Sequence, residues 1–518
     1  MNKLVLYLSL ALCVLALPAF AAEKPSAKPA AGSAASSTPQ ETTTQGSVTV
    51  EGHRINYKAI AGTLILKNKE GKPTGSMFYV AYLKDGSDLA HRPVTFFYNG
   101  GPGSSTVWLH MGAFGPRRVV TEDHTHTPAA PYLLVNNDYS LLDVTDEVFI
   151  DAMGTGFSRI LGKDQGGVGT PKDFYGVDAD GRSFAQFITE FLSKYGRWNS
   201  PKYLFGESYG TTRSAVLAND LETGDDVDLN GVVLLSEILN FNINADFPEI
   251  NPGIDLPYEL MLPTFTATAW YHHKLPNQHA ELQPLLQQVE QFAMNDYAKA
   301  LQAGSTLDPT VKQHMAEQLH NYTGLPVSYL LRANLRVTAP EFEHELLLDS
   351  DEVTGRLDSR FSGPVMDPLS QASEYDPQSA AISSAYVAAF NDYVRKDLKF
   401  GEGMRYRPEI NVFPEWDFKH QQPGAPFALP FTPNVMPDLA SAMIYNPDLK
   451  VLLNSGYFDL ATPFYAAVFT MHHLPMPDKL QSNIQYAFYD SGHMVYAHIP
   501  SLKAIHDNTA KFIESTHQ

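Results

Sequence analysis

A Gly-x-Ser-x-Gly pentapeptide, placed between a strand-like and a helix-like segment, constrains this chain more than any other feature. The apolar run 203–205 leads into Gly206-Glu207-Ser208-Tyr209-Gly210, and the segment 211–221 that follows has a helical pattern. The two glycines permit a sharp, strained turn that presents the serine hydroxyl at its tip. A glycine turn with a solvent-facing serine is the simpler alternative. The flanking strand and helix favour a nucleophile at Ser208.

A nucleophilic serine needs a base, and the base needs an acid that orients it. Two late apolar strands, 450–454 and 484–489, run into turns that carry Asp459 and His493. Asp490 competes as the acid, but it lies in the same turn as His493. Because open α/β sheets place their sites beyond the carboxyl ends of strands, the sequence predicts a triad of Ser208, Asp459 and His493.

A glycine-rich turn, Asn99-Gly100-Gly101-Pro102-Gly103, follows an apolar strand at 94–98. Backbone N–H groups in such a turn complete an oxyanion hole together with the N–H of the residue after the nucleophile, here Tyr209. Phosphate binding is the rival interpretation of a glycine-rich loop. The turn contains neither Gly-Lys-Ser/Thr nor Gly-x-Gly-x-x-Gly, which argues against it.

These segments resemble the serine carboxypeptidase family. The run 99–105 is similar to that family's Asn-Gly-Gly-Pro-Gly-Cys-Ser signature, with Ser104 in place of the cysteine. The segments 154–158, 206–209, 454–459 and 492–495 resemble four further family blocks, in family order. The resemblance extends over most of residues 94–500.

The resemblance implies an α/β-hydrolase fold, with a mostly parallel central sheet flanked by helices and a large inserted cap. It implies a cofactor-free, metal-free exopeptidase that acts on peptides with a free C-terminus. Ser208 is then the nucleophile, His493 the base and Asp459 its orienting acid. The remaining implied roles are the oxyanion hole for Gly101 and Tyr209, the substrate carboxylate for Asn99, Gly100 and Glu207, and the substrate pocket for Met494 and Tyr209.

Two positions depart from the family pattern. A glutamate that shares a proton with the counterpart of Glu207 is replaced by Ala113, and Thr462 stands where many relatives carry a cysteine. Two carboxylates repel each other unless one is protonated. We therefore expect Glu207 to lack its family partner and activity to extend nearer to neutral pH.

The order of segments predicts one interrupted core. We expect a signal peptide at 1–21, a disordered Ala/Pro/Ser/Thr spacer at 22–47, a hydrolase core at 48–239, an inserted cap at 240–441 and the rest of the core at 442–518. The separation of Ser208 and Asp459, 459 − 208 = 251 positions, far exceeds one βα crossover. The signal predicts export to a bacterial periplasm or beyond, with no membrane anchor after cleavage. A net charge of −20 argues against nucleic acid as a partner.

Other functions stay open at this point. An esterase or acyltransferase would use the same fold and triad, and a non-catalytic binding protein would use the scaffold alone. Acidic and histidine-rich segments at 122–126 and 341–345 are interpreted as a solvated loop and an exposed helix turn rather than metal sites. The leaving-residue preference and the oligomeric state are not predicted.

Overall fold

The computed structural model describes residues 37–278, 281–429 and 433–517, and it centres on one mixed sheet. The strand order is β1-β2-β3-β7-β4-β9-β10-β13-β14, with β8 paired to β3. The antiparallel part consists of β1 (Glu41–Val50), β2 (His53–Lys67), β3 (Pro73–Lys84) and β8 (Arg159–Ile160), and β3 pairs antiparallel to β7 (Asp146–Ile150). From β7 onwards the sheet is parallel: β4 (Val94–Tyr98), β9 (Lys202–Glu207), β10 (Gly231–Leu235), β13 (Lys450–Gly456) and β14 (Ile484–Tyr489).

The spacer expected at 22–47 ends earlier than predicted, because β1 begins at Glu41. Residues 41–47 belong to β1, which pairs with β2 over its whole length, so the spacer does not extend to residue 47. Three consecutive threonines, Thr42 to Thr44, favour an extended strand because they are β-branched. The signal peptide predicted at 1–21 lies outside the described residues.

Helices cover both faces of the sheet, as the alternation along β4 requires. Phe97 packs into the apolar core of one face, whereas Phe96 and Tyr98 pack into that of the other. One face is covered by α1 (Val177–Tyr195), α2 (Tyr209–Gly224), α10 (Met436–Tyr445) and α11 (Phe464–His472). The other is covered by α9 (Pro377–Lys396) and α12 (Ile499–Thr516).

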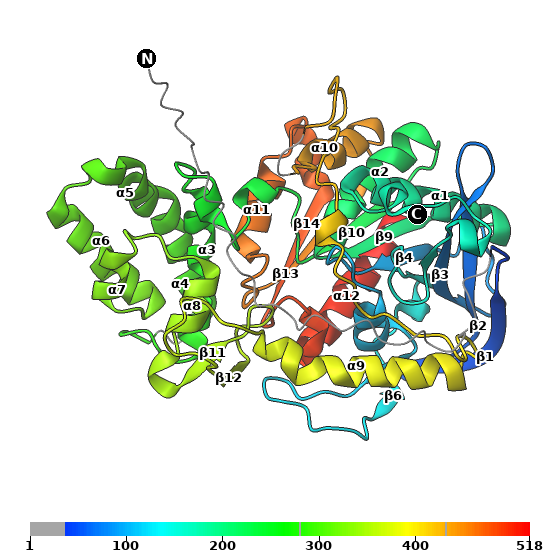
Figure 1. The fold of residues 1–518 in the computed structure, drawn as a ribbon, viewed down its shortest axis with the longest axis horizontal. Helices are drawn as coiled ribbons and strands as arrows, with labels where there is room; N and C mark the ends of the chain where they lie inside the picture. Colours follow the sequence, from blue (N-terminus) through cyan, green and yellow to red (C-terminus); the bar gives the residue numbers. More distant parts are fainter. Residues whose placement is uncertain (1–36, 279–280, 430–432, 518) are drawn as a thin grey trace, which may run out of the picture.

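A group of helices between β10 and β13 forms a helical lobe, defined here as residues 256–345. It contains α3 (Leu256–Tyr271), α4 (Leu282–Phe292), α5 (Ala298–Ala303), α6 (Pro309–Thr323), α7 (Val327–Arg332) and α8 (Ala339–Glu345). Figure 1 shows the lobe gathered to one side of the sheet, while α9 runs along the hydrolase core. The lobe has an apolar cluster of its own, and among the described residues Leu460, next to Asp459, is its one member beyond residue 347. The segment 240–441 therefore divides between this lobe and elements that pack on the sheet.

The segment 341–345 differs from the expected exposed helix turn. It lies in α8, where Phe342, Glu343 and His344 are buried. In the described part of the chain, no three His, Cys, Asp or Glu side chains gather closely enough to hold a metal ion. Over the same residues, no helix has the length and apolar character needed to cross a bilayer. Two short hairpins complete the fold: β5 (Arg117–Val119) with β6 (Leu134–Asn136), and β11 (Glu352–Thr354) with β12 (Ser362–Pro364).

Candidate active site

Ser208 occupies a strained turn between β9 and α2. Its φ of 61° and ψ of −130° lie where non-glycine residues are rare. The flanking glycines are required by close backbone contacts: a Cβ on Gly206 would collide with the carbonyl oxygen of Gly210, and one on Gly210 would lie 2.9 Å from that of Tyr98. The turn therefore has the strand–turn–helix geometry that a nucleophile elbow requires.

Asp459 and His493 come together from the ends of β13 and β14, two neighbouring parallel strands. The Nδ1 of His493 lies 2.8 Å from Oδ2 of Asp459, and the two residues are 4% and 0% exposed. Because an ionised carboxylate only accepts hydrogen bonds, the proton sits on Nδ1 and leaves Nε2 free to accept one. This is the pairing that a general base requires.

The Asp459 carboxylate is fixed by its own turn. The backbone N–H groups of Ala461 and Thr462 each donate to Oδ1 at 2.9 Å, and the Thr462 hydroxyl donates to Oδ2 at 2.6 Å. Thr462 thus has a role that the sequence did not predict. Its position three residues after the acid (462 − 459 = 3) suits an Asx-type turn, and that spacing was the available signal.

The glycine-rich turn lies directly against the elbow. A Cβ on Gly100 would collide with the backbone nitrogen of Tyr209, so only glycine permits this approach. Gly101, next along, has a φ of 107°, which is also a glycine conformation. The turn and the first residue of α2 are therefore close neighbours beside Ser208.

Glu207, directly before Ser208, and Asn99 are both buried, at 3% and 2% exposure. The hydroxyl of Tyr496 donates to Oε2 of Glu207 at 2.8 Å. Burial raises the pKa of Glu207 to about 7, against the opposing effects of His493 and of hydrogen bonds from Tyr496 and Asn99. The residue at position 113 is a fully buried alanine, so it supplies no carboxylate there.

Tyr496 therefore supplies a partner that the sequence did not predict for Glu207. Tyr496 lies in the 3₁₀ helix Val495–Ala497, three residues after His493 (496 − 493 = 3). The same short segment therefore positions both the imidazole of His493 and this hydroxyl. A tyrosine hydroxyl donates a hydrogen bond at any pH below its own pKa, and burial raises the pKa of Tyr496 well above its usual value. The glutamate partner is absent, as Ala113 indicates, and the hydroxyl of Tyr496 donates to Glu207 instead. Activity nearer to neutral pH stays a prediction.

The charged neighbours of His493 raise its pKa. Burial by itself lowers its pKa, but the charge and the hydrogen bond of Asp459, together with Glu207, raise it above the usual value of 6.5. Arg356 opposes this rise. The net charge near His493 thus favours the imidazolium that forms when the base takes a proton.

A cavity of about 660 Å³ opens at Ser208, and its lining includes Gly101 and Tyr209. Its far walls come from the segments around Phe241, Phe247 and Phe413, with Arg356 paired to Asp246 at 2.8 Å. The Tyr209 ring packs edge-on against Trp416, with centroids 5.3 Å apart. Met494 is 6% exposed and is not part of this lining, and neither is Glu207.

Comparison with known proteins identifies the family of the chain. The family model for serine carboxypeptidases matches residues 51–498. Serine carboxypeptidase-like 36 of Arabidopsis thaliana is 26% identical over 202 residues, which cover 37% of this chain and 37% of that protein. Serine carboxypeptidase-like 8 of the same plant is 23% identical over 185 residues, or 34% of this chain and 40% of that protein. The matched stretches thus span less than half of these curated relatives.

A solved structure extends the likeness to the whole fold. Kex1(delta)p, a prohormone-processing carboxypeptidase from Saccharomyces cerevisiae, aligns with a TM-score of 0.52 and 16% identity over 88% of this chain and 91% of that one. At this identity the match shows the fold, and it confirms the predicted α/β-hydrolase architecture. Because the family model runs from the start of β2 to beyond His493, the chain belongs to the serine carboxypeptidase family.

Proposed function

We propose that this protein is a serine-type carboxypeptidase that removes C-terminal residues from peptides through an acyl-enzyme. The observation that carries the proposal is the buried Glu207 beside Ser208, bonded to Tyr496 and with a pKa raised to about 7. An endopeptidase or a simple esterase has no need for a neutral carboxyl group at this place. An exopeptidase does, because a protonated Glu207 donates a hydrogen bond to the terminal carboxylate of the substrate.

The triad performs the acyl transfer. Ser208 attacks the last peptide carbonyl while His493 takes its proton and then passes it to the leaving amine. Asp459 keeps the imidazole in the required tautomer and stabilises its charge. The N–H groups of Gly101 and Tyr209 stabilise the oxyanion. Water then repeats the sequence on the acyl-enzyme and releases the shortened peptide.

The substrate is held from both sides of the scissile bond. Asn99, Gly100 and Glu207 bind the terminal carboxylate, and Met494 lies against the leaving side chain. The Tyr209 ring lies on the acyl side, where it lines the cavity. The segment 240–441 acts as the cap, since Phe241 and Phe413 line the same cavity and limit its access to water.

Mass spectrometry of a peptide digest tests the proposal. The wild-type protein is expected to shorten a peptide from its C-terminus, one residue at a time, and Ser208→Ala is expected to lose this activity. Internal cleavage, or trimming that survives Ser208→Ala, would contradict it.

Ala113 favours a second candidate, an esterase or acyltransferase on the same triad, because the family's second carboxylate is missing from the leaving-group side. Faster turnover of an ester than of the matching peptide, with no dependence on a free carboxylate, would support that candidate. A non-catalytic binding protein is the remaining alternative. Labelling of Ser208 by a fluorophosphonate, with no labelling of Ser208→Ala, excludes it.

We also propose that the protein is exported from a bacterial cell after removal of residues 1–21. The basic start, the apolar run and the small residues Ala19 and Ala21 support this. N-terminal sequencing of protein recovered from the periplasm or medium is expected to begin at Ala22. A chain that keeps Met1 in the cytoplasm would contradict export.

A further inference from the structure

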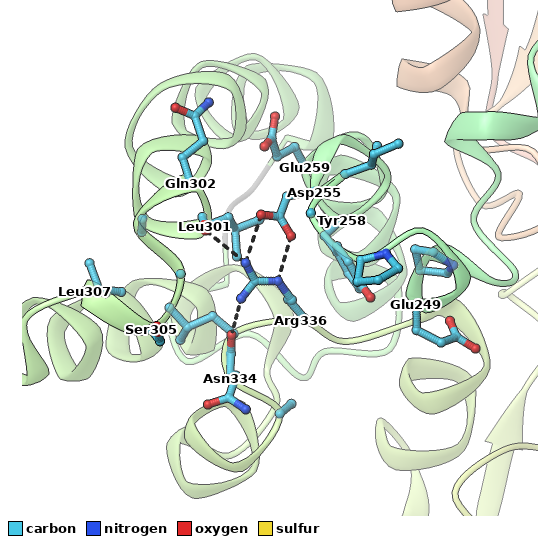
Figure 2. Close-up of a pocket in the computed structure, with 18 of the residues that line it drawn as sticks. Glu249, Asp255, Tyr258, Glu259, Leu301, Gln302, Ser305, Leu307, Asn334 and Arg336 are labelled. Atoms are coloured by element: carbon cyan, nitrogen blue, oxygen red, sulfur yellow. Dashed lines mark hydrogen bonds and ion pairs between the residues drawn. The ribbon is translucent and has the colours of Figure 1, made fainter. Parts of the chain in front are cut away.

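A large cavity lies in the helical lobe, and Ser208 is not part of its lining. It has a volume of about 1340 Å³ and is bounded by the start of α3, the end of α5 and the loop that precedes α8. Figure 2 shows these three segments around it. Pro248 and Asn251 line both this lobe cavity and the cavity at Ser208. The segment Pro248–Ile250 therefore stands at the boundary between the two.

One ion pair in the lobe cavity is complete without a ligand. The guanidinium of Arg336 donates to both oxygens of Asp255, at 2.7 and 2.8 Å, and also to the carbonyl oxygens of Leu301 and Asn334. Lys312 likewise donates to the side chain of Asn334 at 2.7 Å. Both cations of the lining thus have partners, so the cavity offers little to an anion.

Glu259, in the first turn of α3, is the exception. It is only 6% exposed, yet no hydrogen bond or ion pair from the described residues reaches its carboxyl group. In Figure 2 the dashed lines join Arg336 to its neighbours, and none reaches Glu259. Burial, and then the nearby charge of Asp255, raises the pKa of Glu259 to about 7. The carboxyl group lines the cavity, so a ligand held there can donate a hydrogen bond that no described residue supplies.

We propose that the lobe cavity is a second peptide-binding site, in which Glu259 receives a cationic amine of the substrate, upstream of the bond cleaved at Ser208. An ammonium group brings three donors and the charge opposite to that of the carboxylate. Glu249, which also lines the cavity, adds a second acidic group. The boundary shared with the Ser208 cavity provides the reason for a peptide as the ligand, because one extended chain can occupy both. This inference rests on the proposed carboxypeptidase function.

Acetylated octapeptides with one lysine, moved stepwise upstream of the C-terminal pair, test the site against matched norleucine peptides. We expect at least one lysine position to raise kcat/KM about tenfold, the effect of one charge-assisted hydrogen bond. An octapeptide without lysine, with and without its acetyl group, separates an amino terminus from a lysine side chain as the amine. Equal kcat/KM values for all pairs would overturn the proposal.

Two variants locate the effect. Glu259→Gln is expected to abolish the preference for lysine over norleucine. Glu290→Gln in α4 is the matched control, because Glu290 also has a pKa raised by burial to about 7 but does not line the cavity. It is expected to keep the preference. Retention of the preference by Glu259→Gln, or its loss in Glu290→Gln, would contradict the assignment.

Binding separates this inference from the proposed function. Calorimetry with Ser208→Ala needs no turnover, and it is expected to give about tenfold tighter binding of the preferred lysine octapeptide than of its norleucine twin. Equal Kd values overturn the second site even if peptides are trimmed. Tighter lysine binding supports the site even if blocked dipeptides are not cleaved, in which case it is the carboxypeptidase proposal that fails.

Discussion

The hydrolase core and the helical lobe each bury a carboxyl group beside a cavity, and they treat it in opposite ways. In the core, Asp459 is fully buried and accepts hydrogen bonds from two backbone N–H groups, the hydroxyl of Thr462 and His493. In the lobe, the residue Glu259 is 6% exposed, but its carboxyl group lines the cavity and receives no hydrogen bond from the described residues. The first carboxylate has its hydrogen bonds supplied by the protein, whereas burial raises the pKa of the second, which is left to meet water or a ligand.

This difference assigns catalysis to the hydrolase core and the choice of substrate to the helical lobe. Charge that must be present in every turnover is held by elements that the sheet positions, since β13 and β14 are paired along their length. Charge that meets a variable part of the substrate lies in an inserted lobe with its own apolar core. Substitutions in the two regions are therefore expected to alter different quantities.

Asp459→Asn has the largest expected effect. The amide no longer favours the imidazolium and stabilises the wrong tautomer of His493, so kcat is expected to fall by about 10⁴-fold. Steady-state kinetics on a blocked dipeptide measure it. A loss below about tenfold would mean that Asp459 does not orient the base and would remove the contrast with Glu259.

Glu207→Gln tests the carboxylate site through pH. Burial raises the pKa of Glu207 to about 7, so the group is neutral below that pH, and above it becomes negative and repels the substrate carboxylate. KM for a free-acid peptide is expected to rise about tenfold for each pH unit above 7 in the wild type. In Glu207→Gln, which does not titrate, KM is expected to stay flat.

Tyr496→Phe tests the same pKa of Glu207 by removing the hydroxyl that donates to it. The lost hydrogen bond stabilised the charged form of Glu207, so the pKa of Glu207 and the rise in KM are expected to move to higher pH. A shift to lower pH would contradict the role given to Tyr496.

Thr462→Val probes how the core holds its carboxylate. Removing the hydroxyl at 2.6 Å from Asp459 is expected to lower kcat about tenfold, as for one hydrogen bond to a charged group. Thr462→Ser keeps the hydroxyl and is expected to stay near the wild-type rate. Equal losses in both variants would point to packing rather than to the hydrogen bond.

Glu259→Gln has the smallest expected effect, and on stability. The pKa of Glu259 is raised from 4.5 to about 7 in the folded protein, so folding is penalised progressively as pH rises from 4.5 through 7. The variant is expected to be more stable than the wild type at pH 8 by about 1 kcal/mol, a value reduced for screening through the open cavity, and nearly equal at pH 4. Denaturant unfolding at both pH values measures the difference.

The exposed Glu281, in the same lobe, gives the control for this comparison. Glu281→Gln is expected to change stability by less than about 0.5 kcal/mol at either pH. A destabilised Glu259→Gln at pH 8 would show that the carboxylate has a favourable partner, and the lobe would then resemble the core.

Local pattern predicted most of the sheet and the pairing of Asp459 with His493. Strands such as 94–98 and 484–489 are short apolar runs, and they match β4 and β14. Ser208, Asp459 and His493 were found because each follows such a strand by a few residues. The predicted spacer boundary is wrong because Thr42 to Thr44 are polar, as in a spacer, and yet pair with β2 as part of a strand.

Interactions between distant segments were not predictable in this way. Tyr496 reaches Glu207 across 496 − 207 = 289 positions, and no spacing rule connects them. The division of 240–441 between the lobe and α9 depends on which helices pack their apolar faces against the sheet. Glu259 carries no motif, and only its burial without a donor draws attention to it.

Cleavage of a blocked dipeptide and of its C-terminally amidated twin is the most direct test of the central claim, that Glu207 and Asn99 make this a carboxypeptidase. With purified protein at pH 6, where Glu207 is neutral, release of the C-terminal residue is expected from the free acid, with the amide cleaved at a small fraction of that rate. Equal release from the two would contradict carboxylate recognition, and the esterase or acyltransferase candidate would replace it.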